Sequence, residues 1–433
     1  MIVRAIGRML LILGLVACGT GHQMVIAESL WDMKSLSKAP ATYPAPDSQP
    51  TGAACRFYDG ILNKPELRAV DSGTVVKSLY FDGPDYHGRK TRVFAFYGVP
   101  AEAAKHKVPG VVLVHGGGGT AFESWVRLWC ARGYAAIAID TCGCHPAPEP
   151  VHQVRSSDGG PDFSNIFGCE PVPAKDQWPY HAVAGTILAH SLLISMPEVD
   201  KNRTGVIGIS WGSFIVCTAS SLDKRFKFAV STYGCGFIGD NSAWLDDFAK
   251  MGKDAARQWL DRWDPSSYLA MSRVPRLWIT GSNDFAYPMD SLQKSYRLAR
   301  GPQTLCIRTD MLHGHGGPGE NPEEIRAFAD SICKGGKPLI HITGQGRDGS
   351  SAWVSYDGPT RPTSAVLELT SDTGRWQERH WQSVPCKILA GKVTAQLPTE
   401  ARVYFLNLTD ERGFLVSSRY EENPDVRSAG DRK

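Results

Sequence analysis

The chain has 433 residues, enough for one large α/β domain with a smaller module or for two or three ordinary domains. Apolar residues make up 42% and charged residues 21%, which argues against a collagen, a coiled coil or wholesale disorder. The net charge is only +3 and no long Lys/Arg run occurs. A general nucleic-acid binder needs a basic face, so we expect no nucleic-acid partner.

The N-terminus has the pattern of an export signal. Arg4 and Arg8 precede an apolar run over residues 9–16 that is too short to span a bilayer. Residues 15–18 resemble a bacterial lipobox ending at Cys18, whereas cleavage after Ala27 is the alternative. We therefore expect a signal peptide over residues 1–27 and a periplasmic or outer-membrane lipoprotein, or a secreted protein. The only membrane contact expected is through a lipid on Cys18.

Eleven cysteines in an exported chain suggest some disulfides, although the sequence does not fix their pairing. The candidates are Cys55, Cys142, Cys144, Cys169 and Cys235. Cys142 and Cys144 have no matching Cys/His pair at zinc spacing, so no metal site is predicted.

After a Pro- and Ser-rich extension over residues 28–73, the sequence predicts a catalytic domain over 74–335. Two alternating runs, 75–81 and 91–97, predict a β-hairpin. Continuous β-branched runs at 111–114 and 135–139 indicate strands that are covered on both faces, with a helix over 124–132 between them. Further helices are expected over 181–195, 213–221, 291–300 and 322–333, alternating with strands over 204–209, 228–232, 276–280 and 304–308. The expected fold is a mostly parallel sheet with helices on both faces.

Three stretches depart from this rhythm. Residues 142–177 are rich in Pro and Gly and predict an inserted loop, and residues 241–267 predict a lid that contains three tryptophans. From residue 336 to 433, turn signals separate short strands at 366–369, 403–406 and 414–416. That spacing predicts a small C-terminal β-sandwich.

The strongest chemical signal is Gly208-Ile209-Ser210-Trp211-Gly212, between a predicted strand and a predicted helix. A nucleophilic serine on a strained strand-to-helix turn requires small flanking residues, and this G-x-S-x-G pattern supplies them. Ser210 is therefore the predicted nucleophile. The alternative is a turn serine beside a structural glycine pair.

The second signal is His115-Gly116-Gly117-Gly118-Gly119, directly after a predicted strand. Acyl transfer builds negative charge on a carbonyl oxygen, and glycines let backbone N–H groups approach that oxygen closely. We expect the oxyanion hole to be formed by Gly117, Gly118 and Trp211. A phosphate-binding loop is the alternative, but it lacks the following Gly-Lys-Ser/Thr and the spaced G-x-G-x-x-G.

A serine nucleophile needs a base, and the base needs an orienting acid. Asp284 follows a predicted strand and is the expected acid, with Asp290 in reserve. The base is expected to be His313, with His315 as the alternative. The second of these histidines would bind substrate or support the loop.

These residues in this order resemble the α/β-hydrolase superfamily, and within it exported bacterial esterases of the acetyl xylan esterase and dienelactone hydrolase type. Ser210-Trp211-Gly212 and Gly281-Ser282-Asn283-Asp284 carry the resemblance, which covers roughly residues 80–333. Ser213 departs from relatives that have a second glycine there. The resemblance implies two-step acyl transfer through Ser210, His313 and Asp284, without a cofactor.

The substrate is expected to be a small ester or an esterified polysaccharide, because polymers must be attacked outside the cell. His115, Trp178 and Trp244 are predicted to bind it. The tryptophans, together with Trp259, Trp263 and Tyr180, fit a sugar-stacking platform or, alternatively, core packing. The rivals are a lactonase, a peptidase of the prolyl oligopeptidase type and a non-catalytic binding protein. About eighty residues before the first strand leave little room for that peptidase's β-propeller, and a binding protein would predict an incomplete triad.

Overall fold

The computed structural model describes residues 30–45, 74–147, 151–163, 166–167, 172–309, 311–315 and 317–423. The predicted export signal, Cys18, Cys55, Cys169 and most of the N-terminal extension lie outside the described residues. Within these ranges no helix has the length and apolar character needed to cross a bilayer.

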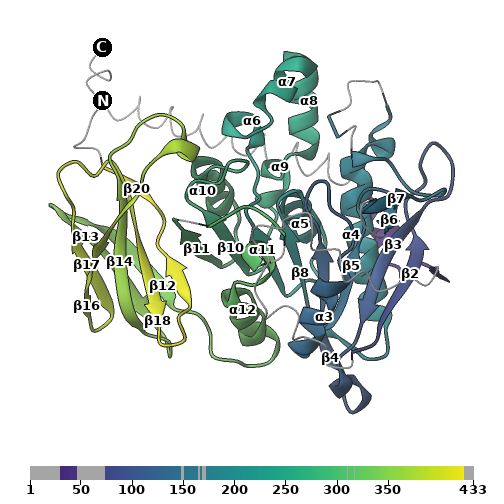
Figure 1. Cartoon of the computed structure of the whole chain (residues 1–433), viewed down its shortest axis with the longest axis horizontal. Coiled ribbons are helices and arrows are strands. Elements are labelled where there is room, and N and C mark those ends of the chain that lie inside the picture. The colour runs from purple at the N-terminus through teal and green to yellow at the C-terminus, as the bar shows by residue number, and fades with distance from the viewer. Residues whose placement is uncertain are drawn as a thin grey trace, which may run out of the picture.

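A twisted central sheet organises the molecule (Figure 1). Its order is β1-β2-β3-β5-β4-β8-β9-β10-β11, and all neighbours from β5 to β11 are parallel. The strands are β1 (Thr42–Pro44), β2 (Val76–Asp82), β3 (Arg92–Gly98), β4 (Val108–Val114), β5 (Ala135–Ile139), β8 (Val199–Ile209), β9 (Phe228–Thr232), β10 (Arg276–Gly281) and β11 (Gln303–Arg308). The antiparallel β2–β3 pair is the predicted hairpin, and the parallel part confirms the predicted fold class.

Helices cover both faces of this sheet because the buried strands are apolar on both sides. In β4, Val112 and Val114 pack into one core, while Val111 and Leu113 pack into the other. The first core includes α4 (Trp178–Ser195), α5 (Trp211–Leu222) and α10 (Met289–Leu298). The second includes α3 (Glu123–Ala131) and α12 (Glu323–Cys333).

The predicted lid is helical and projects beyond the sheet (Figure 1). It consists of α6 (Ile238–Asn241), α7 (Leu245–Met251), α8 (Lys253–Trp263) and α9 (Ser266–Leu269). The predicted inserted loop contains a small hairpin, β6 (Cys144–Pro146) and β7 (Gln153–Arg155), and the 3-10 turn η5 (Ala174–Asp176). The short elements η3 (Ala101–Ala104) and α11 (Gly317–Glu320) lie in connections.

The C-terminal region is a sandwich of two sheets, as the sequence predicts. One sheet has the order β12-β13-β17-β16, and the other contains β19, β18, β14 and β15. The bounds are β12 (His341–Asp348), β13 (Ser351–Asp357), β14 (Pro362–Thr370), η6 (Trp376–Glu378), β15 (Gln382–Pro385), β16 (Lys387–Leu389), β17 (Lys392–Gln396), β18 (Val403–Asp410), β19 (Leu415–Ser417) and β20 (Glu421–Glu422). The second sheet continues the central sheet, because β19 pairs with β11 at Ser417 and Leu305. The sequence pattern gives no indication of this fusion.

The N-terminal segment 30–45 docks on α4 through Trp31 and α2 (Met33–Leu36). Trp31 is buried and stacks on Tyr180 with ring centroids 5.0 Å apart. The Ser191 hydroxyl donates to the Leu36 carbonyl oxygen at 2.6 Å. This segment therefore belongs to the folded domain.

Candidate active site

Ser210 lies on a strained turn between β8 and α5. Its φ of 55° and ψ of −120° are unusual for a residue other than glycine. A Cβ at Gly208 would lie 2.3 Å from the Gly212 carbonyl oxygen, and one at Gly212 would lie 2.0 Å from that of Val114. Both glycines are therefore required by close backbone packing. Ser213 fits because its Oγ lies 2.5 Å from the Gly208 carbonyl oxygen and 2.8 Å from that of Thr232.

The structure brings Ser210, His313 and Asp284 into one hydrogen-bonded chain. His313 Nε2 lies 2.8 Å from Ser210 Oγ, and His313 Nδ1 lies 2.7 Å from Asp284 Oδ2. With the ring proton on Nδ1, His313 donates to Asp284 and accepts the hydroxyl proton of Ser210. This is the arrangement in which an imidazole can remove the proton from a serine nucleophile.

Asp284 is buried and fixed by its own loop. Its Oδ1 accepts hydrogen bonds from the amides of Ala286 at 3.0 Å and Tyr287 at 2.7 Å, which leaves Oδ2 for His313. Asp290, the reserve candidate, lies in the first turn of α10, where Oδ2 is 3.5 Å from Asn241 Nδ2. The geometry favours Asp284 as the acid.

His315 contacts the glycine turn rather than the serine hydroxyl. Its Nε2 accepts the Gly116 amide proton at 2.8 Å, and its Nδ1 lies 3.5 Å from Glu320 Oε1. The ring packs on Phe122 with centroids 4.6 Å apart. His315 thus supports the loop, the second of the two roles expected for the histidine that is not the base.

The glycine turn lies beside Ser210. A Cβ at Gly116 would be 3.0 Å from Ser210 Cβ, and one at Gly117 would be 2.8 Å from Trp211 Cδ1. Trp211 is the first residue of α5, where a backbone N–H has no partner within the helix. The Gly117 and Trp211 amides are therefore the best candidates for an oxyanion hole. Gly118, with a φ of 71°, occupies the exposed tip of the turn.

His115 lies beneath the turn, contrary to the prediction that it binds substrate. It is 2% exposed, with Nδ1 2.7 Å from the Gly116 carbonyl oxygen and Nε2 3.0 Å from the Thr141 amide. Burial lowers the pKa of His115 to about 3, so the ring stays neutral. The neighbouring Asp140 accepts the Cys142 and Cys144 amides, and burial raises its pKa to about 6. His115 therefore shapes the turn from below.

Of the two interpretations of the aromatic residues, the structure supports core packing over a sugar-stacking platform for most of them. Trp178, Trp259, Trp263 and Tyr180 are buried, and the Trp178 indole donates to the Thr141 carbonyl oxygen at 2.7 Å. Only Trp244 is partly exposed, packing on Trp211 with ring centroids 4.5 Å apart. A run of tryptophans in an amphipathic lid buries its indoles against the domain, and the sequence cannot distinguish this from a binding surface.

Tyr233 is a site residue that the sequence analysis missed. It follows β9 with a φ of 34°, and its ring stacks on His313 with centroids 4.2 Å apart. Its hydroxyl donates to the Gly314 carbonyl oxygen and accepts the Gly314 amide proton at 3.2 Å. Its position at the carboxyl end of a parallel strand next to β8 is the only signal that could have identified it.

Among the residues that the structure describes, the cysteines and acidic side chains form no second chemical centre. Cys142, Cys144 and Cys235 carry buried free thiols, so the expectation of disulfides at these three positions is wrong, while Cys55 and Cys169 lie outside the described residues. Burial raises the pKa values of the Cys142 and Cys235 thiols well above normal. Across the described ranges, no cluster of three or more His, Cys, Asp or Glu residues could hold a metal ion.

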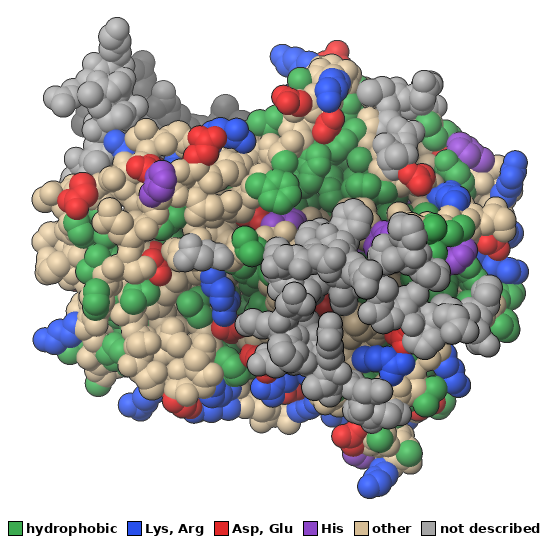
Figure 2. Space-filling model, in the orientation of Figure 1, with side chains coloured by type: hydrophobic (Ala, Val, Ile, Leu, Met, Phe, Trp, Pro, Cys, Tyr) green, Lys and Arg blue, Asp and Glu red, His purple; other side chains and the backbone are tan. Residues whose placement is uncertain are grey.

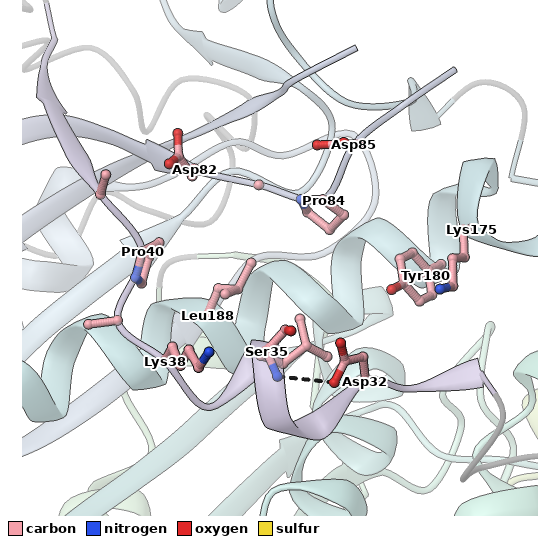
Figure 3. A pocket seen from close by; sticks show the side chains of 14 residues that line it. Asp32, Ser35, Lys38, Pro40, Asp82, Pro84, Asp85, Lys175, Tyr180 and Leu188 are labelled. Atoms are coloured by element: carbon pink, nitrogen blue, oxygen red, sulfur yellow. Dashed lines mark hydrogen bonds between the residues drawn. The ribbon is translucent and has the colours of Figure 1, made fainter. Parts of the chain in front are cut away.

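A separate groove lies where the N-terminal segment meets the turn between β2 and β3 (Figure 3). Asp82 and Asp85 lie across it from Ser35 and Lys38. The Ser35 amide donates to Asp32 Oδ1 at 3.1 Å within α2. Apart from Tyr180, none of the residues predicted to act in catalysis or substrate binding lines this groove.

Two family models match the chain. The acetyl xylan esterase model matches residues 62–242, and the prolyl oligopeptidase family model matches residues 173–332. A curated relative is an "uncharacterized peptidase YuxL" of Bacillus subtilis (strain 168), 25% identical over 217 residues, which are 46% of this chain and 30% of the relative. The chain thus spans less than a third of that relative's length.

Among solved structures, an acetyl xylan esterase from Paenibacillus sp. R4 is 18% identical, with a TM-score of 0.51 over 69% of this chain and 92% of its own. Acetyl xylan esterase 1 from Thermoanaerobacterium sp. JW/SL YS485 is also 18% identical, with a TM-score of 0.45 over 66% of this chain and 94% of its own. Together with the parallel sheet and the strand-to-helix turn at Ser210, the likeness to the first structure establishes the fold. The chain has the α/β-hydrolase fold, with sequence similarity to both acetyl xylan esterases and prolyl oligopeptidases.

Proposed function

We propose that this protein is a serine esterase that cleaves carboxylic esters by two-step acyl transfer. The observation that carries the proposal is the continuous chain of hydrogen bonds from Ser210 Oγ through His313 to Asp284. Ser210 attacks the ester carbonyl while His313 takes its proton, and the Gly117 and Trp211 amides receive the oxyanion. His313 then returns the proton to the leaving alcohol, and water releases the acyl group from Ser210.

The acyl group that we propose is small, such as acetyl. The acetyl xylan esterase model supports this choice because its match includes the glycine turn and Ser210. Crowding supports it too, since a Cβ at Gly117 would lie 2.7 Å from Phe163 Cζ. A carbohydrate ester remains a candidate substrate on the strength of the family similarity, whereas the buried indoles provide no sugar platform.

Peptide cleavage is the second candidate, favoured by the prolyl oligopeptidase match over residues 173–332, which includes the three triad residues. The same triad serves both reactions, so only a comparison of substrates can distinguish an esterase from a peptidase. A panel of small acetate esters and peptide p-nitroanilides should show turnover of the esters. Faster release of p-nitroaniline from the peptides than of alcohol from the esters, at equal substrate concentration, would favour the peptidase.

The test of the proposal is p-nitrophenyl acetate hydrolysis by the wild type and by Ser210→Ala, followed by acetate release from acetylated xylan. We expect the variant to lose at least a thousandfold in kcat, because only the binding pocket and oxyanion amides remain. A fluorophosphonate should label the wild type and not the variant. Equal turnover by both proteins would refute the catalytic role of Ser210.

We further propose that the protein acts after export, either anchored through Cys18 or released after cleavage at Ala27. The basic start and the short apolar run of the N-terminus support this location. Radiolabelled palmitate should be incorporated by the wild type and not by Cys18→Ser if the anchor is real. A cytoplasmic full-length product in cell fractions would refute export.

A further inference from the structure

Exposed apolar side chains occur in the chain segments that carry the catalytic imidazole, its acid and the edge of the lid. Among the described residues, seven large hydrophobic side chains are exposed: Val75, Val151, Val154, Leu245, Phe285, Leu312 and Leu389. Three of these belong to segments that build the site, since Phe285 follows Asp284, Leu312 precedes His313 and Leu245 follows Trp244. Their exposed fractions are 58%, 55% and 39% for Phe285, Leu312 and Leu245. Single exposed apolar residues are normal, but a group at one site indicates binding.

We call Leu245, Phe285 and Leu312 the apolar rim. The Phe285 ring lies 4.8 Å from the His313 ring. Trp244, the neighbour of Leu245, packs on Trp211 at 4.5 Å and on Tyr287 at 5.0 Å, which brings this edge of the lid to the same site. Figure 2 shows hydrophobic side chains gathered at the foot of α7 and α8, beside a histidine.

The position of the rim relative to the triad indicates which part of a substrate it meets. His313 Nε2 faces Ser210 Oγ and must give its proton to the oxygen of the leaving group. The leaving group therefore departs beside His313, whereas the acyl carbonyl oxygen points to the Gly117 and Trp211 amides. The Phe285 ring lies beside the His313 ring, and Leu312 is the exposed residue directly before His313. We therefore infer that the rim meets the leaving group and not the acyl group.

We propose that the leaving group taken by this site is a large apolar alcohol of the phenol or naphthol type rather than a sugar hydroxyl. The inference rests on the proposed esterase function and specifies its substrate. The rim side chains offer no hydrogen-bond donor or acceptor, so a polyhydroxylated leaving group packed on them would lose hydrogen bonds to water without replacement. An aromatic leaving group would instead remove its own apolar surface and that of the rim from water.

The reaction is the one already described, with a defined alcohol. The bond from Ser210 Oγ to the acetyl carbon forms, the bond from that carbon to the aryl oxygen breaks, and the proton from Ser210 reaches the aryl oxygen through His313. Water then attacks the acetyl-serine and releases acetate. No further reactant is needed.

The experiment compares kcat/KM for 2-naphthyl acetate and for ethyl acetate, whose leaving group is too short to cover the rim. Phe285→Ala should lower the value for the naphthyl ester about tenfold, and Leu312→Ala about threefold, within the range expected for apolar pocket contacts. The value of kcat/KM for ethyl acetate should fall several-fold less than that for the naphthyl ester in both variants. Phe285→Leu should retain most of the naphthyl activity because it keeps an apolar side chain.

Leu389→Ala is the matched control, because Leu389 is 43% exposed on β16 of the C-terminal sandwich. This substitution should change kcat/KM for neither ester. Thermal unfolding should confirm that every variant is folded. Equal losses on both esters in Phe285→Ala, or none, would overturn the inference while leaving the esterase function intact. The inference would also be overturned if the wild type preferred acetylated xylan to the naphthyl ester and Phe285→Ala lowered kcat/KM for both substrates equally. A wild type that hydrolyses no ester and takes no fluorophosphonate would overturn the proposed function itself, and the inference with it.

Discussion

Tyr233 shows how one buried side chain can hold a catalytic loop. Its ring supports the face of His313, and its hydroxyl bonds to both the amide and the carbonyl of Gly314. Its own amide donates to the Ile279 carbonyl oxygen at 2.6 Å, which fixes it to β10. Since the loop after β11 has to place His313 between a serine and a carboxylate, a second anchor restricts the positions of the imidazole.

Tyr233→Phe keeps the ring but removes these two hydrogen bonds. We expect kcat for p-nitrophenyl acetate to fall about tenfold with KM little changed, because His313 loses its position relative to Ser210. Tyr134→Phe is the matched control, since it removes a buried tyrosine hydroxyl that donates to Asp330 of α12 at 2.9 Å and does not contact the His313 loop. If both variants had the same kcat, the hydroxyl of Tyr233 would have no positioning role.

His181 should make stability depend on pH. It lies in the first turn of α4, and burial lowers its pKa to about 4. Between about pH 4 and pH 6.5 the unfolded chain binds a proton at this residue and the folded chain does not, so stability falls as the pH falls. From pH 7.5 to pH 5, urea unfolding of the wild type should lose about 2 kcal/mol more than His181→Gln. Parallel pH curves for the two proteins would contradict this.

The N-terminal segment contributes to stability through a single indole. Trp31 stacks on Tyr180, lies edge-on to Trp263 and Tyr268, and donates its Nε1 proton to the Tyr268 hydroxyl at 3.3 Å. It thereby joins α2 to α4 and to the lid helices α8 and α9. Its removal would leave a cavity among these four elements.

Trp31→Ala should lower the free energy of unfolding by about 3 kcal/mol, the lower end of what truncating a buried tryptophan costs. Lys34→Ala, at an exposed position of α2, should change it by less than about 0.5 kcal/mol. Urea unfolding followed by circular dichroism measures both. A Trp31 variant as stable as the Lys34 variant would show that the segment is not docked in solution.

The elements that the sequence predicts well are those whose local pattern agrees with their final surroundings. The apolar runs at β4 and β5 indicate strands covered on both faces, and Gly208 and Gly212 indicate a turn that no larger residue could make. The order of the triad follows from strands that end at one edge of a parallel sheet. These are constraints that a few neighbouring residues express.

Contacts between distant segments were not predictable in this way. A lid tryptophan has the same sequence signal whether its ring is buried, as at Trp259, or partly exposed, as at Trp244. His115 was predicted to face substrate because it adjoins the glycine turn, yet its ring points down to Thr141. The pairing of β19 with β11 joins residues more than one hundred positions apart, and no local pattern encodes that distance.

The joining of the two sheets brings the C-terminal sandwich into contact with the active site. The segment around η6 lies beside the loop that carries Asp284, where Asn283 Nδ2 donates to the carbonyl oxygens of Gln377 at 3.2 Å and Arg379 at 2.6 Å. Gln377 Nε2 in turn donates to the Asn241 carbonyl oxygen, at 3.4 Å, where the lid begins. One short segment of the sandwich therefore contacts both the acid loop and the lid.

Asn283→Ala tests whether the sandwich helps to position the acid. The substitution removes both hydrogen bonds, and we expect kcat to fall about tenfold because the Asp284 carboxylate is held less firmly against His313. Gln345→Ala is the control, since Gln345 Nε2 donates to the Arg419 carbonyl oxygen at 3.1 Å within the sandwich, and its loss should lower the melting temperature without changing kcat. Because the central sheet runs through β11 and β19 into the sandwich, both variants should still unfold in a single transition. Equal kcat values for the two variants would show that the sandwich stabilises the protein without positioning its carboxylate.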